Sequence, residues 1–233
     1  FFQAEDRIRP VEWARWLGDV YKRQSHSGGS GFGFGFASGF RCAGSFVFGL
    51  RGEAVTIDTA CSSSLVGLHF AAGNLRPRTT LDALVSGANL TVAAHWSLSC
   101  ARAGMLTRDG RCKTLDAAAD GYVRGEACEC LVLSDSAGRP GAERLAAARR
   151  PGALVVGGTA ANQDGRASSL TAPSGPAQQA VIAAALGDAS TRAGCVAGLQ
   201  LHGTGTALGD PIEIGAAAQV VLQGRAASPD GVV

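Results

Sequence analysis

The sequence predicts an α/β protein in which strands alternate with helices along the chain. Two apolar segments, 55–57 and 196–201, each end near a chemically reactive residue type, and a turn and a helix follow each of them. A third apolar segment, 154–158, precedes an alanine-rich helix at 177–186. Strands that alternate with helices are typical of layered α/β architectures.

The composition indicates a globular protein and argues against several other classes. With 233 residues, the chain suffices for one large domain or for part of a larger one. A net charge of +2 and the lack of a long Lys/Arg run give no support for a nucleic-acid partner. The apolar runs are shorter than the roughly 18 residues of a membrane span, and the first residues lack a secretory signal pattern. We therefore expect no membrane association.

The cysteines predict free thiols. They number seven, an odd count, and no CxxC pair occurs. Their positions are 42, 61, 100, 112, 128, 130 and 195. This scattered pattern favours a reducing compartment, the cytoplasm, over a disulfide framework, and it contains no metal-ligand spacing.

The first 40 residues differ in character from the rest of the chain. We interpret residues 1–24 as a non-native leader, because they are charged and Trp-rich and have no amphipathic period. The alternative is a short helix at 11–20. Residues 25–40 form a Gly/Phe-rich segment of low complexity without the spacing of a phosphate-binding loop. The folded part is expected at 41–233.

The remaining elements follow from periodicity and from turn residues. Leu65, Leu68, His69 and Ala72 recur at helical spacing, and a Gly-Pro pair after Ser174 is typical of a helix start. Helices are expected at 43–50, 62–75, 97–106, 177–186 and 211–222. Strands are expected at 55–57, 82–88, 122–133, 154–158 and 196–201, with a polar loop at 111–121.

Cys61 is the first candidate for a catalytic residue. It stands between the expected strand 55–57 and a helix that begins at Ser62. The positive end of a helix dipole favours the thiolate, which is the nucleophilic form of cysteine. From these residues alone, a buried structural cysteine is an equally good interpretation.

His202 is the second candidate, at the end of the expected strand 196–201. The Gly-Thr-Gly-Thr run after it allows close backbone approach, and the hydroxyls of Thr204 and Thr206 are available to orient the imidazole or to bind a polar substrate. A single histidine is more often structural, but cysteine and histidine cooperate in space rather than in sequence. His69 and His95 are weaker candidates, because one lies on an apolar helix face and the other in a polar stretch.

Two motifs carry a resemblance to a known family. Asp58-Thr-Ala-Cys61-Ser-Ser-Ser and His202-Gly-Thr-Gly-Thr-Ala-Leu-Gly-Asp-Pro resemble the signature motifs of β-ketoacyl synthases, specifically the ketosynthase domains of modular type I polyketide synthases. The runs at 101–126 and 161–182 also resemble that family and occur in the same order. The resemblance covers residues 41–222.

The resemblance implies a thiolase-like fold with layers α/β/α/β/α, built from two pseudo-repeated halves, and a homodimer for the full-length protein. Family members carry a second histidine and a Gly/Phe-rich loop downstream of the His202 motif, and neither can be placed before Val233. We therefore expect an incomplete fold, the N-terminal half plus the start of the C-terminal half. Such a fragment would carry two of three catalytic residues and would be inactive alone.

The resemblance also implies an acyltransferase reaction in polyketide biosynthesis, a decarboxylative Claisen condensation. Cys61 would accept an acyl chain from the phosphopantetheine thioester of an acyl carrier protein, and a malonyl-type carrier thioester would extend that chain. His202 would stabilise the enolate, and Thr204 and Thr206 would contact the substrate's pantetheine arm. No cofactor is expected to bind directly, since the carrier protein supplies the phosphopantetheine.

Several alternatives remain at this point. One is a non-elongating or inactive ketosynthase that only holds or transfers acyl chains, or a non-catalytic partner protein. Others are a fatty-acid synthase condensing domain and a thiolase, whereas no motif supports a cysteine protease. The presence of both Cys61 and His202 favours the condensing enzyme, because the non-elongating and partner forms often lack one of them.

Overall fold

The computed structural model describes four stretches of the chain, which are 45–75, 82–135, 154–169 and 172–226. The predicted leader 1–24 and the low-complexity segment 25–40 lie outside the described residues. By compactness the chain divides into two units, Phe1–Val66 and Gly67–Val233.

The described part of the first unit leads to Cys61. Residues 45–48 are helical, which agrees with the expected helix at 43–50. The 3-10 helix η1 (Ala60–Ser62) follows, and α3 (Ser63–Leu75) begins directly after it. The predicted strand 55–57 is wrong, since these residues form no strand with any described part of the chain and Val55 is 49% exposed.

The second unit contains a two-stranded antiparallel sheet. β1 (Asp82–Asn89) pairs with β2 (Ala127–Ser134), and Val85 stands opposite Leu131. Val85 is buried, and a Cβ placed at Gly67 of α3 would meet its Cγ1 at 3.5 Å. The glycine therefore lets α3 lie close to the sheet. Strand β1 confirms the prediction at 82–88, although only Val85 in it is buried.

Two predicted elements occur with shifted bounds. The helix expected at 97–106 is α4 (Ala94–Arg102), which ends because Gly104, at φ +69°, turns the chain. The strand expected at 122–133 begins only at Ala127. Tyr122 instead forms an isolated parallel bridge with Leu106, so residues before β2 belong to the intervening loop.

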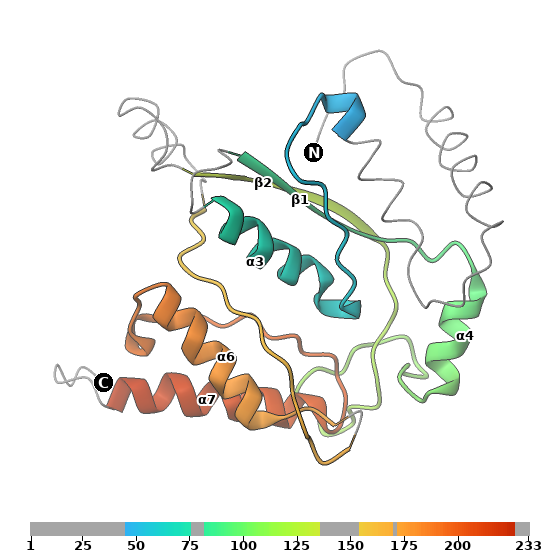
Figure 1. Cartoon of the computed structure of the whole chain (residues 1–233). Helices are drawn as coiled ribbons and strands as arrows, with labels where there is room; N and C mark the ends of the chain where they lie inside the picture. Colours follow the sequence, from blue (N-terminus) through green and yellow to red (C-terminus); the bar gives the residue numbers. More distant parts are fainter. Residues whose placement is uncertain (1–44, 76–81, 136–153, 170–171, 227–233) are drawn as a thin grey trace. The chain divides into compact units, whose positions relative to one another are not determined.

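Two helices near the end of the described chain pack against each other (Figure 1). In α6 (Gly175–Asp188), the Ser174 hydroxyl accepts the N–H of Ala177 at 3.3 Å, and proline occupies the first turn. The second helix is α7 (Gly209–Ala226), which buries Ala216, Ala217 and Val221. Both helices confirm the sequence-based predictions.

The strands predicted at 154–158 and 196–201 are not formed. Both segments run as extended chain without a partner strand in the described residues, and the Leu154 side chain is 97% exposed. An apolar pattern reports which residues favour burial, but a strand exists only where a neighbouring strand accepts its backbone hydrogen bonds. The short 3-10 helix η2 (Ala193–Cys195) precedes the second of these segments.

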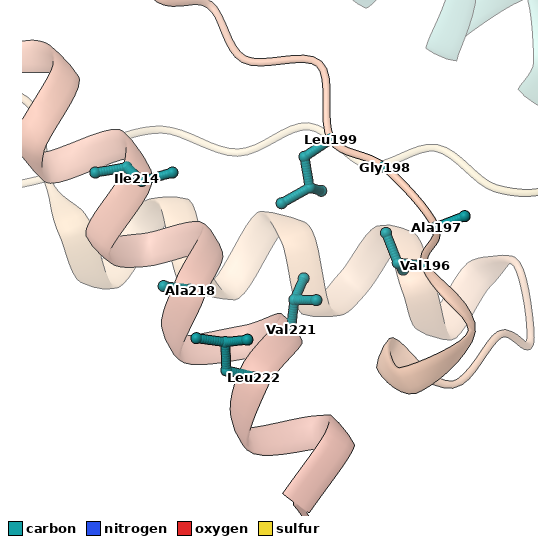
Figure 2. A pocket seen from close by; sticks show the side chains of 8 residues that line it. All are labelled: Val196, Ala197, Gly198, Leu199, Ile214, Ala218, Val221 and Leu222. Carbon is teal, nitrogen blue, oxygen red and sulfur yellow. The ribbon is translucent and has the colours of Figure 1, made fainter. Parts of the chain in front are cut away.

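The segment 196–199 and helix α7 enclose an open apolar pocket of about 290 Å³ (Figure 2). Leu199 from the segment and Val221 from the helix both extend into the space between them. The lining residues are Val196, Ala197, Gly198, Leu199, Ile214, Ala218, Val221 and Leu222. The pocket lies between α7 and the chain segment that leads to His202.

The described cysteines are all free thiols, as predicted for these positions. They are Cys61, Cys100, Cys112, Cys128, Cys130 and Cys195. Among the described residues, no helix is both long enough and apolar enough to cross a membrane. Over the same residues, no cluster of three or more His, Cys, Asp or Glu side chains is arranged to hold a metal ion.

Candidate active site

Cys61 lies in a strained turn at the start of α3. The preceding residue, Ala60, has φ +58°, a left-handed conformation that costs about 1–2 kcal/mol for a residue with a Cβ. The Asp58 carboxylate accepts the N–H of Ala60 at 3.1 Å, and the Ser63 hydroxyl donates to the Ala60 carbonyl at 2.7 Å. Side chains on both sides of Ala60 therefore hold the turn that presents Cys61.

The position of Cys61 suits a nucleophile. The side chain is exposed, and the 13-residue helix α3 begins two residues after it. The unpaired N–H groups at a helix start carry partial positive charge, which favours the thiolate. The prediction of a thiol at the start of a helix is confirmed, while the strand expected before it is absent.

His202 lies at the start of a tight turn that ends in α7. Gly203 and Gly205 have φ +55° and +71°, conformations that disfavour any residue with a Cβ. A Cβ at Gly205 would also lie 2.8 Å from the backbone nitrogen of Lys113. The imidazole-bearing residue itself is exposed. The glycines of the motif thus give the turn a shape that lets another loop approach its backbone.

Two carboxylates from α7 hold this turn. Glu213 accepts the backbone N–H of His202 at 2.6 Å and that of Gly203 at 2.9 Å. Asp210, only 3% exposed, accepts the N–H of Gly205 at 3.1 Å and the N–H of Leu115 at 2.8 Å. A buried carboxylate without such donors would be costly, so these bonds fix the backbone around His202.

A third element, the loop 105–122, contacts the turn from its other side. The Thr114 hydroxyl donates to the Gly203 carbonyl at 2.6 Å, and the N–H of Gly121 donates to the Gly205 carbonyl at 2.9 Å. The N–H of Leu115, at φ +58°, makes the bond to Asp210 described above. The turn is therefore clamped between this loop and α7.

An ion-pair network stiffens the loop. The Lys113 ammonium contacts Asp120 at 2.7 Å and Asp109 at 3.2 Å. Its hydrogen bond lowers the pKa of Asp120, and Asp120 in turn raises the pKa of Lys113. The pKa of Asp109 is lowered first by the hydroxyl of Thr107 and then by Lys113. Asp109 and Asp120 are exposed and Lys113 is half-buried, so solvent weakens the network.

The threonines of the motif face each other. Their hydroxyl oxygens, Oγ1 of Thr204 and Oγ1 of Thr206, are 3.2 Å apart, and Thr206 Oγ1 also accepts the N–H of Gly209 at 3.1 Å. Thr206 thereby supports the start of α7. The Thr204 hydroxyl retains hydrogen-bonding capacity for a ligand, since a hydroxyl both donates and accepts.

The structure brings His202, Thr204 and Thr206 together in one turn. Cys61 belongs to the other compact unit, so the candidate site is described in two halves. The weaker candidates have local contacts that fit structural roles. The Nδ1 of His69 lies 2.8 Å from the hydroxyl of Thr159, and the ring of His95 lies 5.9 Å from that of Trp96.

Sequence reasoning missed three residues that hold the His202 turn, namely Thr114, Asp210 and Glu213. A signal was present for Asp210, because an acidic residue in the first turn of a helix favours its N-terminus, and Pro211 lies in the same turn. The contact of Thr114 gives no such signal, since it joins residues 89 positions apart.

Comparison with protein families assigns both halves of the chain to one enzyme family. The family model described as β-ketoacyl synthase, N-terminal domain, matches residues 18–137. The model described as β-ketoacyl synthase, C-terminal domain, matches residues 153–232.

Curated relatives agree with this assignment. The chain is 45% identical over 229 residues to a phenolphthiocerol/phthiocerol polyketide synthase of Mycobacterium tuberculosis, covering 97% of this chain and 9% of that protein. It is 46% identical over 184 residues to polyketide synthase GfsA of Streptomyces halstedii, covering 78% of this chain and 2% of that protein. The chain thus spans less than a tenth of the length of either relative.

Solved structures show the same fold. A ketosynthase from module 6 of the bacillaene synthase of Bacillus subtilis 168 matches with a TM-score of 0.70 and 34% identity, over 78% of this chain and 32% of that one. An oxazolomycin ketosynthase domain of Streptomyces albus JA3453 matches with a TM-score of 0.72 and 28% identity, over 96% of this chain and 36% of that one. These matches confirm the predicted α/β, thiolase-like fold.

Proposed function

Because the chain belongs to the β-ketoacyl synthase family, we propose that the protein containing it is an acyltransferase that extends acyl chains by decarboxylative Claisen condensation in polyketide biosynthesis. The observation that carries this proposal is the exposed thiol of Cys61 in a strained turn at the start of α3. The relatives named above are polyketide synthases, which supports a polyketide over a fatty-acid product.

In the first step, Cys61 takes the acyl chain. Its thiolate attacks the carbonyl carbon of an acyl thioester on the phosphopantetheine arm of an acyl carrier protein. A new carbon–sulfur bond forms to Cys61, and the arm leaves as a thiolate that takes up a proton. Backbone N–H groups at the turn, including that of Cys61, stabilise the negative oxygen of the tetrahedral intermediate. The exposure of Cys61 supports this role, because the carrier arm must reach the sulfur.

In the second step, the chain grows by two carbons. A malonyl-type carrier thioester loses carbon dioxide, and the electron pair of the broken bond passes into an enolate. The enolate carbon then attacks the Cys61 thioester, and the Cys61 thiolate leaves as the β-ketoacyl product forms. A thiolate is both a good nucleophile and a good leaving group, so one residue serves both steps.

His202 stabilises the enolate. Negative charge accumulates on the thioester oxygen during decarboxylation, and a neutral imidazole donating a hydrogen bond lowers the energy of that charge. The rigid backbone of the His202 turn, held by Glu213 and Asp210, supports this role because catalysis by a hydrogen-bond donor requires fixed geometry. Thr204 and Thr206 contact the pantetheine arm from the same turn.

The partners follow from this chemistry. An acyl carrier protein delivers both thioesters, and the enzyme needs no cofactor of its own beyond the carrier's phosphopantetheine. We further propose that the full-length protein is a homodimer in the cytoplasm. The free thiols of the described cysteines support a reducing compartment.

Acyl loading of Cys61 tests the proposal. The full-length protein is incubated with the N-acetylcysteamine thioester of a short acyl chain, and its mass is then measured intact. We expect one acyl adduct on the wild type, none on Cys61→Ala, and an adduct on the control Cys195→Ala, which removes another exposed thiol. Loading that persists in Cys61→Ala would remove Cys61 from the mechanism. A wild type that loads but never extends with a malonyl thioester would indicate a non-elongating ketosynthase.

A further inference from the structure

Three successive peptide groups around His202 are each held by a side chain from elsewhere in the second unit. Glu213 accepts the N–H of His202 and the N–H of Gly203, which belong to the first and second of these peptide groups. The carbonyl of Gly203 belongs to the third, and it accepts the hydroxyl of Thr114 at 2.6 Å. The first two peptide groups flank His202 and set the direction in which its Cα–Cβ bond leaves the backbone. The third acts on His202 through the backbone dihedral angles of Gly203, which join it to the second.

Thr114 contacts Gly203 in two ways. Besides the hydrogen bond from its hydroxyl, its Cγ2 lies where a side chain on Gly203 would have to be, since a Cβ there would approach this methyl carbon to 2.8 Å. Gly203 has φ +55°, so the turn reaches Thr114 only in this left-handed conformation. The methyl group of Thr114 thus excludes a side chain at position 203, and its hydroxyl holds the carbonyl of Gly203.

The residues directly before and after Thr114 in the chain have contacts of their own that hold the backbone there. On one side, Lys113 pairs with Asp109 and Asp120. On the other, Leu115 donates its N–H to the buried carboxylate of Asp210 and adopts φ +58°, a conformation rarely seen in leucine. Backbone strain of this kind persists only where the surroundings impose it, and such positions cluster at functional sites.

We propose that Thr114 is a positioning residue for His202. Its hydroxyl orients the peptide group after Gly203, and so holds the imidazole where the enolate oxygen forms. This inference rests on the proposed function of His202. It adds a residue from the N-terminal half of the chain to a motif from the C-terminal half, and it gives the Arg111-Cys-Lys-Thr-Leu-Asp116 loop a role in condensation.

The test separates the two steps of the reaction in the full-length protein. Thr114→Val keeps the shape of the side chain but removes the hydroxyl, whereas Thr114→Ser keeps the hydroxyl. We expect Thr114→Val to lower the rate of condensation with a malonyl thioester about tenfold and to leave acyl loading of Cys61 unchanged. We expect Thr114→Ser to retain most of the condensation rate.

Thr191→Val is the matched control. The hydroxyl of Thr191 also donates to a backbone carbonyl, that of Ala189 at 3.1 Å, but does so at the end of α6. This variant should condense like the wild type. The inference is overturned if Thr114→Val condenses normally, if it loses loading and condensation equally, or if Thr114→Ser is as impaired as Thr114→Val.

A second measurement does not depend on activity. Hydrogen–deuterium exchange of the amides of His202 and Gly203 should be several times faster in Thr114→Val than in the wild type, and unchanged in Thr114→Ser and Thr191→Val. Unchanged exchange in Thr114→Val would overturn the inference even if the wild type shows no condensation activity. Faster exchange in Thr114→Val, found together with a wild type that lacks condensation activity, would support the contact and overturn the proposed function instead.

Discussion

Leu115 donates its backbone N–H to the Asp210 carboxylate at 2.8 Å, although the two residues are 95 positions apart. The other carboxylate oxygen of Asp210 accepts the N–H of Gly205 at 3.1 Å. One side chain, only 3% exposed, therefore joins the loop 105–122 to the turn that carries His202. Asp210 is thus the buried part of a junction that also includes the bonds from Thr114 to Gly203 and from Gly121 to Gly205.

We expect Asp210→Ala to destabilise the protein by about 3 kcal/mol, because it leaves two backbone N–H groups without their charged acceptor. Urea unfolding of the full-length protein measures the change. The control is Asp116→Ala, since Asp116 is exposed and its carboxylate accepts the nearby N–H of Ala118, two residues away. That variant should lose less than about 1 kcal/mol, and an equal loss in both variants would contradict this role of Asp210.

Gly121 should tolerate no side chain. Its φ is +136°, and a Cβ would lie 2.5 Å from the carbonyl oxygen of Met105 and 2.7 Å from the backbone nitrogen of Thr107. Both contacts are with backbone, which cannot move aside easily. We expect Gly121→Ala to cost at least about 3 kcal/mol, measured by thermal or urea unfolding.

Gly110 provides the comparison for Gly121. It also has a positive φ, +73°, but a Cβ there meets nothing within 4 Å. Gly110→Ala should therefore cost only the free energy of placing a residue with a Cβ at a positive φ, about 1–2 kcal/mol. If the two variants were equally stable, steric exclusion at Gly121 would be refuted.

His202→Ala should separate the two chemical steps. Loss of one hydrogen-bond donor to a developing oxyanion typically lowers a rate by about 10²–10³, and we expect this loss in condensation with little change in acyl loading. Intact mass measures loading, and product formation from a malonyl thioester measures condensation. His95→Ala, which removes an imidazole elsewhere in the second unit, should affect neither step. Equal losses of loading and condensation in His202→Ala would assign the residue a different role.

The ion pairs of Lys113 predict a dependence of stability on acid. The pKa of Asp120 is lowered by Lys113, and the pKa of Asp109 by Thr107 and Lys113. Their stabilising contribution is therefore complete above the ordinary value of 3.8 and disappears as the pH falls through the lower folded values. Asp120→Asn should be slightly less stable than the wild type at neutral pH, and this difference should vanish in strong acid. A difference that persists at the lowest pH would contradict the assignment.

Local signals in the sequence predicted the helices well. α6 begins where the Gly-Pro pair after Ser174 indicates a helix start, and the Ser174 hydroxyl forms an N-cap hydrogen bond there. α7 begins at Gly209 of the His202 motif and has Pro211 in its first turn. These elements were predictable because helix signals lie within a few residues of each other.

The strands and the contacts that hold the His202 turn could not be predicted from such local signals. Segment 196–201 has the apolar pattern of a strand, yet it forms no ladder with any segment that the structure describes, because pairing depends on a second segment. The bond between Thr114 and Gly203 joins residues 89 positions apart and leaves no periodic pattern. Cys61 and His202 were candidates from their positions in the sequence, and family resemblance gave their expected roles, whereas the side chains that hold the His202 backbone became apparent only in three dimensions.

The contacts of Thr114 and Leu115 have a consequence for hybrid synthases. They lie in the stretch matched by the N-terminal family model, 18–137, while Gly203 and Asp210 lie in the stretch matched by the C-terminal one, 153–232. A chimera with its crossover between residues 137 and 153 would take the two sides of this clamp from different parents. Recombination designs should therefore transfer the loop 105–122 together with the turn 202–210, or select parents that share both.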